Sequence, residues 1–227
     1  RCSLRPKSPS ASRLRRDRAA SGKGHLVYPS AMLSNLITRL KSRSGGQKPE
    51  DGRSRRFVAM IDCMLNQNAR DLGAARFPAM NFDLLRLCHE NHVGILQMPC
   101  PEIAALGFKR TRAPGQSIRA ALDTVAGRHC CAETAVNVAD RIAAQLADGN
   151  QLLAVLGGNQ QSPGCAVHAG ASGLGEDSGI FLQALQAELD KRCIAATFRG
   201  IRDADPALLA EDLAWFGELI GQPPSQT

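Results

Sequence analysis

From residue 57 onward, short apolar runs alternate with longer stretches in which apolar residues recur at helical spacing. The apolar runs have the length of buried strands and lie at 57–65, 93–100, 151–159 and 193–201. Stretches of helical character lie near 79–91, 117–147, 178–191 and 206–220. Repeated alternation of strands and helices predicts one three-layer α/β domain, with helices on both faces of a mostly parallel sheet.

Local signals refine the boundaries of two of these helices. The sequence "AGRHCC" at 126–131 interrupts the periodicity of the long helix predicted near 117–147, so we expect a break there. Pro206 after "DAD" favours the start of the last helix, and Pro223–Pro224 favours its end. The domain is therefore predicted to span residues 56–222, with a short carboxyl-terminal tail at 223–227.

Positive charge is concentrated at the amino-terminal end of the chain. Residues 1–56 hold 15 Lys and Arg against 3 Asp and Glu, whereas the remaining residues hold 13 basic and 18 acidic side chains. Residues 1–55 are rich in Arg, Ser, Gly and Pro, a composition that predicts a disordered basic tail. Three interpretations of this tail stay open: a dispensable extension, a transit peptide and an arm that binds nucleic acid.

Composition argues against two classes of protein. The acidic balance of the domain and the 4% of aromatic residues in the chain do not favour nucleic-acid binding, unless the basic tail takes part. No apolar run is long enough to span a membrane, and no secretory signal is recognisable. We therefore expect a cytoplasmic protein that makes no membrane contact.

Three of the eight cysteines follow predicted strands. Cys63, Cys100 and Cys165 each lie at or just after the carboxyl end of an apolar run. Ligands of parallel α/β sheets bind beyond these ends, so we expect the three thiols to converge on one rim of the sheet. Pro99 and Pro101 fix their own φ angles and favour extended backbone before them, which makes the segment around Cys100 stiff.

Two interpretations of this convergence are open. Three thiolates can hold a metal or an iron–sulfur cluster and leave one metal position free for a substrate. Cysteine is also among the most commonly buried residues, so the placement can be coincidental. No C-x-x-C sequence is present, which removes the usual spacing of zinc knuckles and thioredoxin-like sites.

The sequences around the three cysteines resemble a known family. "DCMLNQNAR" (62–70), "LQMPCPEIAALGFKR" (96–110) and "QSPGCAV" (161–167) are similar, in order and spacing, to three motifs of the thiouracil desulfurase family and its desulfidase relatives. The segment 176–201 also resembles the end of that family's sequence. The resemblance covers about residues 57–202.

The resemblance implies a 4Fe–4S cluster held by Cys63, Cys100 and Cys165. It further implies that the fourth iron receives the sulfur of a thiocarbonyl substrate such as a thiolated pyrimidine, and that water replaces this sulfur at carbon. Glu102 of the "CPE" sequence is then the candidate general acid and base, and Ser162 the candidate that orients substrate or water. Glu102 can alternatively stabilise the start of the helix that follows it.

Other residues near these motifs carry weaker expectations. Asn66, Asn68 and Arg70 follow the first cysteine and either bind polar groups of the substrate or satisfy a loop. The third motif reads S-P-G-C-A where the family has S-P-S-C-G, so Gly164 lacks a hydroxyl and Ala166 adds a methyl group. This departure affects the expected placement of the substrate more than the expected binding of a cluster.

The sequence therefore predicts a desulfurase that acts on a small thiolated compound and releases sulfide, which a separate acceptor can take up. Two alternatives remain. The first is a non-enzymatic carrier of an iron–sulfur cluster or of sulfide. The second is a zinc-binding or nucleic-acid-binding module with a basic tail.

Overall fold

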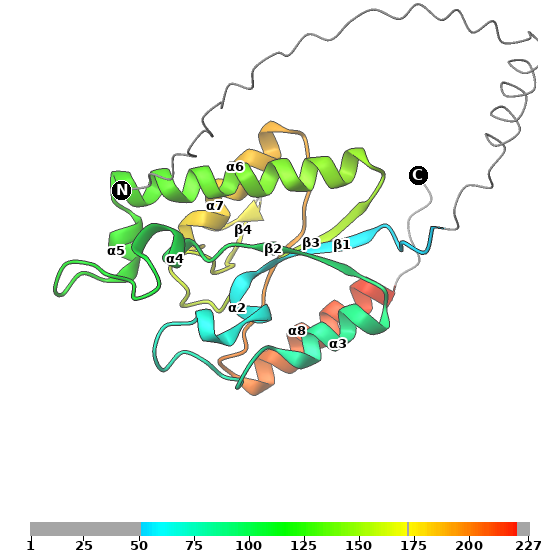
Figure 1. Cartoon of the computed structure of the whole chain (residues 1–227), viewed down its shortest axis with the longest axis horizontal. Coiled ribbons are helices and arrows are strands. Elements are labelled where there is room, and N and C mark those ends of the chain that lie inside the picture. Colours follow the sequence, from blue (N-terminus) through cyan, green and yellow to red (C-terminus); the bar gives the residue numbers. More distant parts are fainter. Residues whose placement is uncertain (1–50, 172, 222–227) are drawn as a thin grey trace, which may run out of the picture. The chain divides into compact units, whose positions relative to one another are not determined.

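Four parallel strands form the central sheet, in the order β2-β1-β3-β6 (Figure 1). Their bounds are Arg56–Ile61 for β1, Gly94–Met98 for β2, Gln151–Gly157 for β3 and Phe198–Gly200 for β6. The β1 strand pairs with β2 from Phe57 opposite Gly94 to Ile61 opposite Met98, and it is buried from Phe57 onward. The predicted parallel sheet is thereby confirmed.

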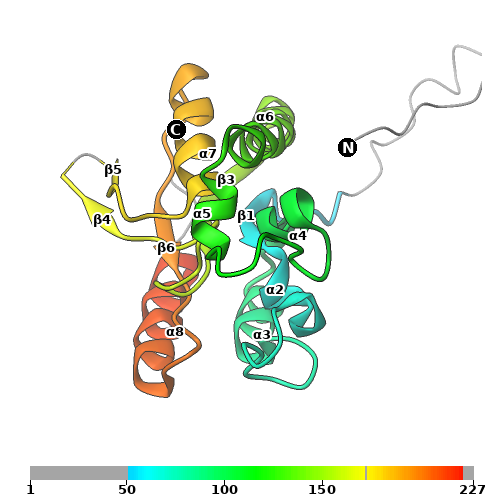
Figure 2. The same cartoon turned by 90° about the vertical axis from the view of Figure 1, so that its left-hand side faces the viewer.

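Helices cover both faces of this sheet. Helices α6 (Val125–Ala147) and α7 (Ile180–Lys191) lie together on one side, and α3 (Phe82–Glu90) and α8 (Pro206–Gly221) lie on the other (Figure 1, Figure 2). The core between the layers includes fully buried side chains from the strands and from both helical layers, among them Met60, Leu156, Phe181, Leu84 and Phe216. The predicted single three-layer α/β domain is confirmed.

The computed structural model describes residues 51–171 and 173–221. Of the expected tail at 1–55, only residues 51–55 therefore belong to the described residues, and 1–50 lie outside them. The expected tail at 223–227 and the helix end at Pro223–Pro224 lie outside them as well. Within the described part of the chain, no helix combines the length and the apolar character that crossing a membrane requires.

Short elements follow the strands at their carboxyl ends. They are α2 (Asp62–Leu65), η1 (Gln67–Ala69), α4 (Pro101–Leu106), α5 (Ile118–Leu122) and the antiparallel pair β4 (Ala169–Gly170) and β5 (Gly173–Leu174). Two apolar runs are consequently shorter as strands than predicted. The first run turns into α2 after Ile61, and only 198–200 of the last run is extended.

The helix predicted near 117–147 is broken, but the break does not lie at 126–131. It falls at Asp123 and Thr124, between α5 and α6, and 126–131 belongs to the first turns of α6. The Thr124 side chain caps α6 by accepting a hydrogen bond from the Gly127 N–H at 3.1 Å. A Cβ at Gly127 would lie only 2.5 Å from the Leu122 carbonyl oxygen, so the glycine that weakens the helical pattern is what lets the two helices meet.

The expected start of the last helix is confirmed. Helix α8 begins at Pro206, where the missing N–H costs no helical hydrogen bond. Asp205 Oδ1 accepts hydrogen bonds from the backbone N–H groups of Ala207 and Leu208, at 2.8 and 3.3 Å. The Asp-Ala-Asp-Pro sequence is thus a helix start with an identifiable cap.

Candidate metal centre

Cys63, Cys100 and Cys165 line one cavity of about 660 Å³ at the carboxyl ends of the strands. Cys63 lies in α2, two residues after β1 ends, and Cys100 directly precedes α4, which follows β2. Cys165 lies in the loop after β3. The structure therefore places the three thiols on one rim, as the positions of the strand ends predict.

The backbone around Cys100 is arranged by its two proline neighbours. Cys100 is the N-cap residue of α4 and has extended backbone, φ −66° and ψ 116°, while Pro101 occupies the first helical position. Burial raises the pKa of the Cys100 thiol, and the backbone N–H groups of Ile103 and Glu102 at the start of α4 oppose this rise. The helix start thus stabilises the thiolate, the form that binds metals.

At Cys63 an arginine side chain, and not a helix start, opposes the effect of burial on the thiol. Burial raises the pKa of the Cys63 thiol to about 11, and the neighbouring Arg70 guanidinium opposes the rise through its positive charge. Arg70 is itself buried and donates from Nη2 to Asp203 Oδ2 at 2.6 Å and from Nη1 to the Ala74 carbonyl at 3.1 Å. A cation is therefore fixed beside the first thiol.

Cys165 is the most deeply enclosed of the three thiols. Burial raises its pKa well above the ordinary value, the other two thiols raise it further, and a hydrogen bond from the Ser162 hydroxyl lowers it. The predicted residue Ser162 therefore lies against a candidate ligand. A Cβ at Gly158 would lie only 2.8 Å from the Cys165 sulfur. Glycine at this position therefore leaves enough space for the sulfur atom.

Gly164, where the resembling family has serine, is explained by packing. A Cβ at this position would collide with Cγ of Pro101 and would lie 3.4 Å from a methyl carbon of Leu122. Pro101 belongs to the Cys100 motif, so the second and third cysteine motifs are in direct contact here. The missing hydroxyl is thus tied to close packing between two of the cysteine loops.

We expect Gly164→Ala to destabilise the domain by roughly 1–3 kcal/mol, the usual cost of overpacking a filled site. Gly217→Ala is the matched control, because a Cβ at that helical position meets nothing within 4 Å. The control should be neutral or stabilising by up to about 1 kcal/mol through helix propensity. Urea unfolding of both variants measures the difference, and equal stabilities would contradict the contact with Pro101.

Glu102 and Arg110 form a second charged pair on the cavity wall. Arg110 Nε donates to Glu102 Oε2 at 3.2 Å, and the two side chains are 2% and 13% exposed. Arg110 Nη2 also lies 3.9 Å from the Cys100 sulfur and donates to the Ala69 carbonyl. Glu102 therefore faces the cavity from the first turn of α4 with its carboxylate held by an arginine, rather than as a helix cap alone.

Arg110 was not among the site residues predicted from the sequence. Its signal lies in the "GFKR" stretch that ends the second motif, where Gly107 has φ 76° and Arg110 has φ 45°. A positive φ is uncommon for a residue other than glycine and costs free energy. The turn that folds the guanidinium back onto the motif is thus held in an unfavourable conformation by its buried contacts.

Asp203 and Asn159 are two further site residues without a sequence prediction. Asp203 accepts from Arg70 and, at 2.7 Å, from Nδ2 of Asn159, whose Oδ1 accepts from the backbone N–H of Ala204 at 2.9 Å. Both residues follow strands, β3 for Asn159 and β6 for Asp203. Both positions lie at or just after the end of a predicted strand, as the cysteines do, so they could have been found as polar residues at strand ends.

The three residues expected to bind substrate after the first cysteine separate into two groups. Arg70 lines the cavity, whereas Asn66 and Asn68 are exposed and do not line it. Asn66 Oδ1 accepts from both the backbone N–H and the side-chain amide of Asn68, each at 3.1 Å. These two asparagines satisfy a loop, which was the alternative interpretation, and only Arg70 is placed to meet a ligand.

The donor chemistry at this cavity fits an iron–sulfur group. Within residues 51–171 and 173–221, no group of three or more His, Cys, Asp and Glu side chains is arranged to hold a metal ion, and this includes the three cysteines. The cavity nevertheless offers three soft thiol donors, the ligand type of iron–sulfur clusters. It also contains the buried Nε of Arg70, which has no hydrogen-bond acceptor among the described residues.

The raised thiol pKa values predict slow alkylation of the cavity cysteines. At pH 8 the thiolate fraction of Cys63 should be about a hundredfold below that of an ordinary cysteine, because each pKa unit changes it tenfold. Among the cysteines in the described part of the chain, Cys193 is exposed and should react first with iodoacetamide. Peptide mass spectrometry over time gives the labelling rate of each cysteine, and equal rates would contradict the burial of the three thiols.

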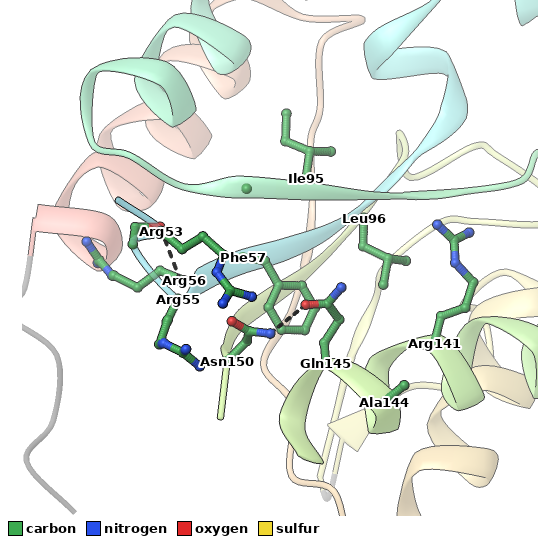
Figure 3. Close-up of a pocket in the computed structure, with 12 residues that line it drawn as sticks. Arg53, Arg55, Arg56, Phe57, Ile95, Leu96, Arg141, Ala144, Gln145 and Asn150 are labelled. Carbon is green, nitrogen blue, oxygen red and sulfur yellow. Dashed lines mark hydrogen bonds between the residues drawn. The ribbon is translucent and has the colours of Figure 1, made fainter. Parts of the chain in front are cut away.

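A second hollow lies near the opposite ends of the strands (Figure 3). It is lined by residues that precede or begin β1 and β2, by part of α6 and by the residue before β3: Arg53, Ser54, Arg55, Arg56, Phe57, Gly94, Ile95, Leu96, Arg141, Ala144, Gln145 and Asn150. Arg141 donates to the Gln97 carbonyl at 3.2 Å, and Asn150 to the Gln145 side chain at 2.7 Å. This hollow has no thiol or carboxylate lining, so the cysteine cavity is the candidate for chemistry.

Comparisons of the chain with protein-family models, with curated proteins and with solved structures find no match. The case for a function therefore rests on the geometry of the cavity and on the resemblance of the three motifs.

Proposed function

We propose that this chain is an iron–sulfur-dependent desulfurase of the cytoplasm, which converts a small thiocarbonyl compound and water into the oxo compound and hydrogen sulfide. The observation that carries the proposal is the meeting of Cys63, Cys100 and Cys165, from three separate strand ends, on the wall of one cavity. A lone buried cysteine needs no ligand, but three thiols from distant parts of the sequence form a donor set.

The three cysteines would hold a 4Fe–4S cluster, which supplies a Lewis-acidic iron with an open position for the soft sulfur of a C=S group. The cavity of about 660 Å³ has the size of sites that take small ligands, so a thiolated base or nucleoside fits it. A separate acceptor would remove the sulfide.

Glu102 is the residue placed to move protons. Its carboxylate lines the cavity next to the cysteines, and its contact with Arg110 Nε fixes its orientation. It can accept a proton from the water that adds to the thiocarbonyl carbon and return it to the departing sulfur. Ser162 also lines the cavity, beside Cys165, and its hydroxyl donates a hydrogen bond to that sulfur.

The test is anaerobic reconstitution of the full chain with iron and sulfide, followed by absorption and EPR spectra before and after addition of 2-thiouracil. The proposal expects a cluster spectrum that changes with the thiobase, and stoichiometric release of uracil and sulfide. A stable cluster without turnover of any thiopyrimidine would favour the carrier. Zinc without iron, or a protein that binds no metal, would overturn the proposal.

A further inference from the structure

The ion pair between Arg70 and Asp203 is the most deeply buried one at the cavity. The Arg70 side chain is 6% exposed and the Asp203 side chain is 0% exposed, with 2.6 Å between Nη2 and Oδ2. Removing two charges from water costs as much free energy as their attraction returns, so stability alone is a weak reason for such a pair. Its position beside Cys63 suggests another reason.

Both carboxylate oxygens of Asp203 accept hydrogen bonds, which fixes the orientation of its partner Arg70. Its Oδ1 accepts from Asn159 and its Oδ2 from Arg70, which joins the segments that follow β1, β3 and β6. Arg70 uses Nη1 for the Ala74 carbonyl. The guanidinium is thus fixed at both terminal nitrogens, with its plane set by the protein.

The remaining donor of Arg70 points to a missing acceptor. Its Nε is buried, and among residues 51–171 and 173–221 it has no hydrogen-bond partner. A buried N–H without an acceptor loses its hydrogen bond to water without replacement, so such donors are rare unless a ligand completes them. Because Arg70 lines the cavity and acts on the Cys63 thiol through its charge and through side-chain hydrogen bonding, the acceptor for this N–H is the Cys63 sulfur or the group that the three thiols hold.

We propose that the buried Arg70–Asp203 pair controls the hydrogen bonding and charge balance at Cys63, and thereby the reduction potential of the centre held by the three cysteines. This inference rests on the proposed function. Arg70 donates its N–H toward the sulfur atoms of the centre, and Asp203 is the positioning residue that orients this donor and compensates its charge. Hydrogen bonds and net charge near the sulfurs are among the main determinants of cluster potentials.

Because Arg70 and Asp203 carry opposite charges, replacing one or the other should shift the reduction potential of the cluster in opposite directions. Asp203→Asn leaves the positive charge of Arg70 uncompensated, which stabilises the more negative, reduced cluster and raises the potential. Arg70→Gln leaves the carboxylate of Asp203 uncompensated and lowers the potential. Arg70→Lys keeps the charge and should lie near the parent protein. A purely structural role would weaken cluster retention in these variants without opposite shifts.

The experiment is a redox titration of the reconstituted full chain, monitored by the EPR signal of the reduced cluster. We expect each single variant to shift the ratio of reduced to oxidised cluster about tenfold at fixed ambient potential, which is 59 mV for one electron. The double variant Arg70→Gln/Asp203→Asn removes both charges and should return toward the parent value. Arg86→Gln is the control, because Arg86 is an exposed residue of α3.

Shifts of the same sign, or no shifts, would overturn the inference and leave the proposed function standing. Should the parent chain assemble no cluster, the proposed function fails, and the inference that rests on it fails with it.

Discussion

We expect replacement of Cys100 by serine to abolish assembly of the iron–sulfur cluster in the proposed centre, and Cys88→Ser and Cys193→Ser to leave it intact. Cys100 lies on the cavity wall between its two prolines, and a serine hydroxyl does not supply the thiolate that such clusters require. The effect should be complete, from full iron loading to none, because two remaining thiols do not retain a cluster. Iron and sulfide analysis after anaerobic reconstitution measures it.

The two control cysteines separate ligation from folding. Cys88 is 2% exposed in the core on α3, so its replacement tests how the domain tolerates a hydroxyl in place of a buried thiol. Cys193 is exposed after α7 and tests the loss of a surface thiol. Equal loss of iron in all three variants would mean that misfolding, and not ligation, explains the result. Cys63→Ser and Cys165→Ser should behave like Cys100→Ser.

The fold and the meeting of the three cysteines could be predicted because both follow from periodicity. Strands in a parallel sheet end at one edge, so a residue that follows any strand is placed near residues that follow the others. This is why Cys63 and Cys165 could be brought together across about a hundred residues of sequence. The same rule reaches Asp203 after β6, although a lone aspartate in "RDADP" has no motif to single it out.

The contacts between loops could not be predicted from the sequence. Arg110 reaches Glu102 and the Ala69 carbonyl only because its backbone turns back with φ 45°, and no periodic pattern reports such a turn. Asn66 and Asn68 looked equivalent to Arg70, since all three follow Cys63. The 3-10 turn of η1 decides that the asparagines bond to each other in solvent and that Arg70 enters the cavity.

The role of Gly164 could not be predicted from the sequence either. The sequence presents Gly164 as a lost serine and thus as a change in substrate placement. In the structure it is a close approach, since Pro101 fills the space that a side chain would need. The replacement of a motif residue by glycine can therefore reflect close packing between two motifs, and not only the loss of a functional hydroxyl. The glycines beside Cys165 belong to the architecture that holds its sulfur.

Replacing Asp212 by alanine should destabilise the domain by about 3 kcal/mol, as expected when one partner of a buried charged network is removed. Asp212 lies on α8 with a side chain that is 0% exposed. Its carboxylate accepts from Arg199 Nε at 2.9 Å and from the Arg202 backbone N–H at 2.8 Å, besides the Arg202 guanidinium. Glu211→Ala is the matched control, since Glu211 contacts the same Arg202 from an exposed position and should cost under about 1 kcal/mol.

The stability that Asp212 contributes should decrease as the pH falls. Burial alone would raise the pKa of Asp212, but hydrogen bonds from Arg202 and Arg199 outweigh burial and hold the pKa below its usual value. A lowered pKa in the folded state gives stability that is fully present above the unfolded pKa of about 3.9 and is lost as pH falls through the folded value. Urea unfolding at pH 7 should therefore show the full difference between the parent chain and Asp212→Ala, and the difference should shrink below about pH 4. A difference that grew in acid would mean that the carboxylate is protonated in the folded protein and that the arginine contacts do not govern it.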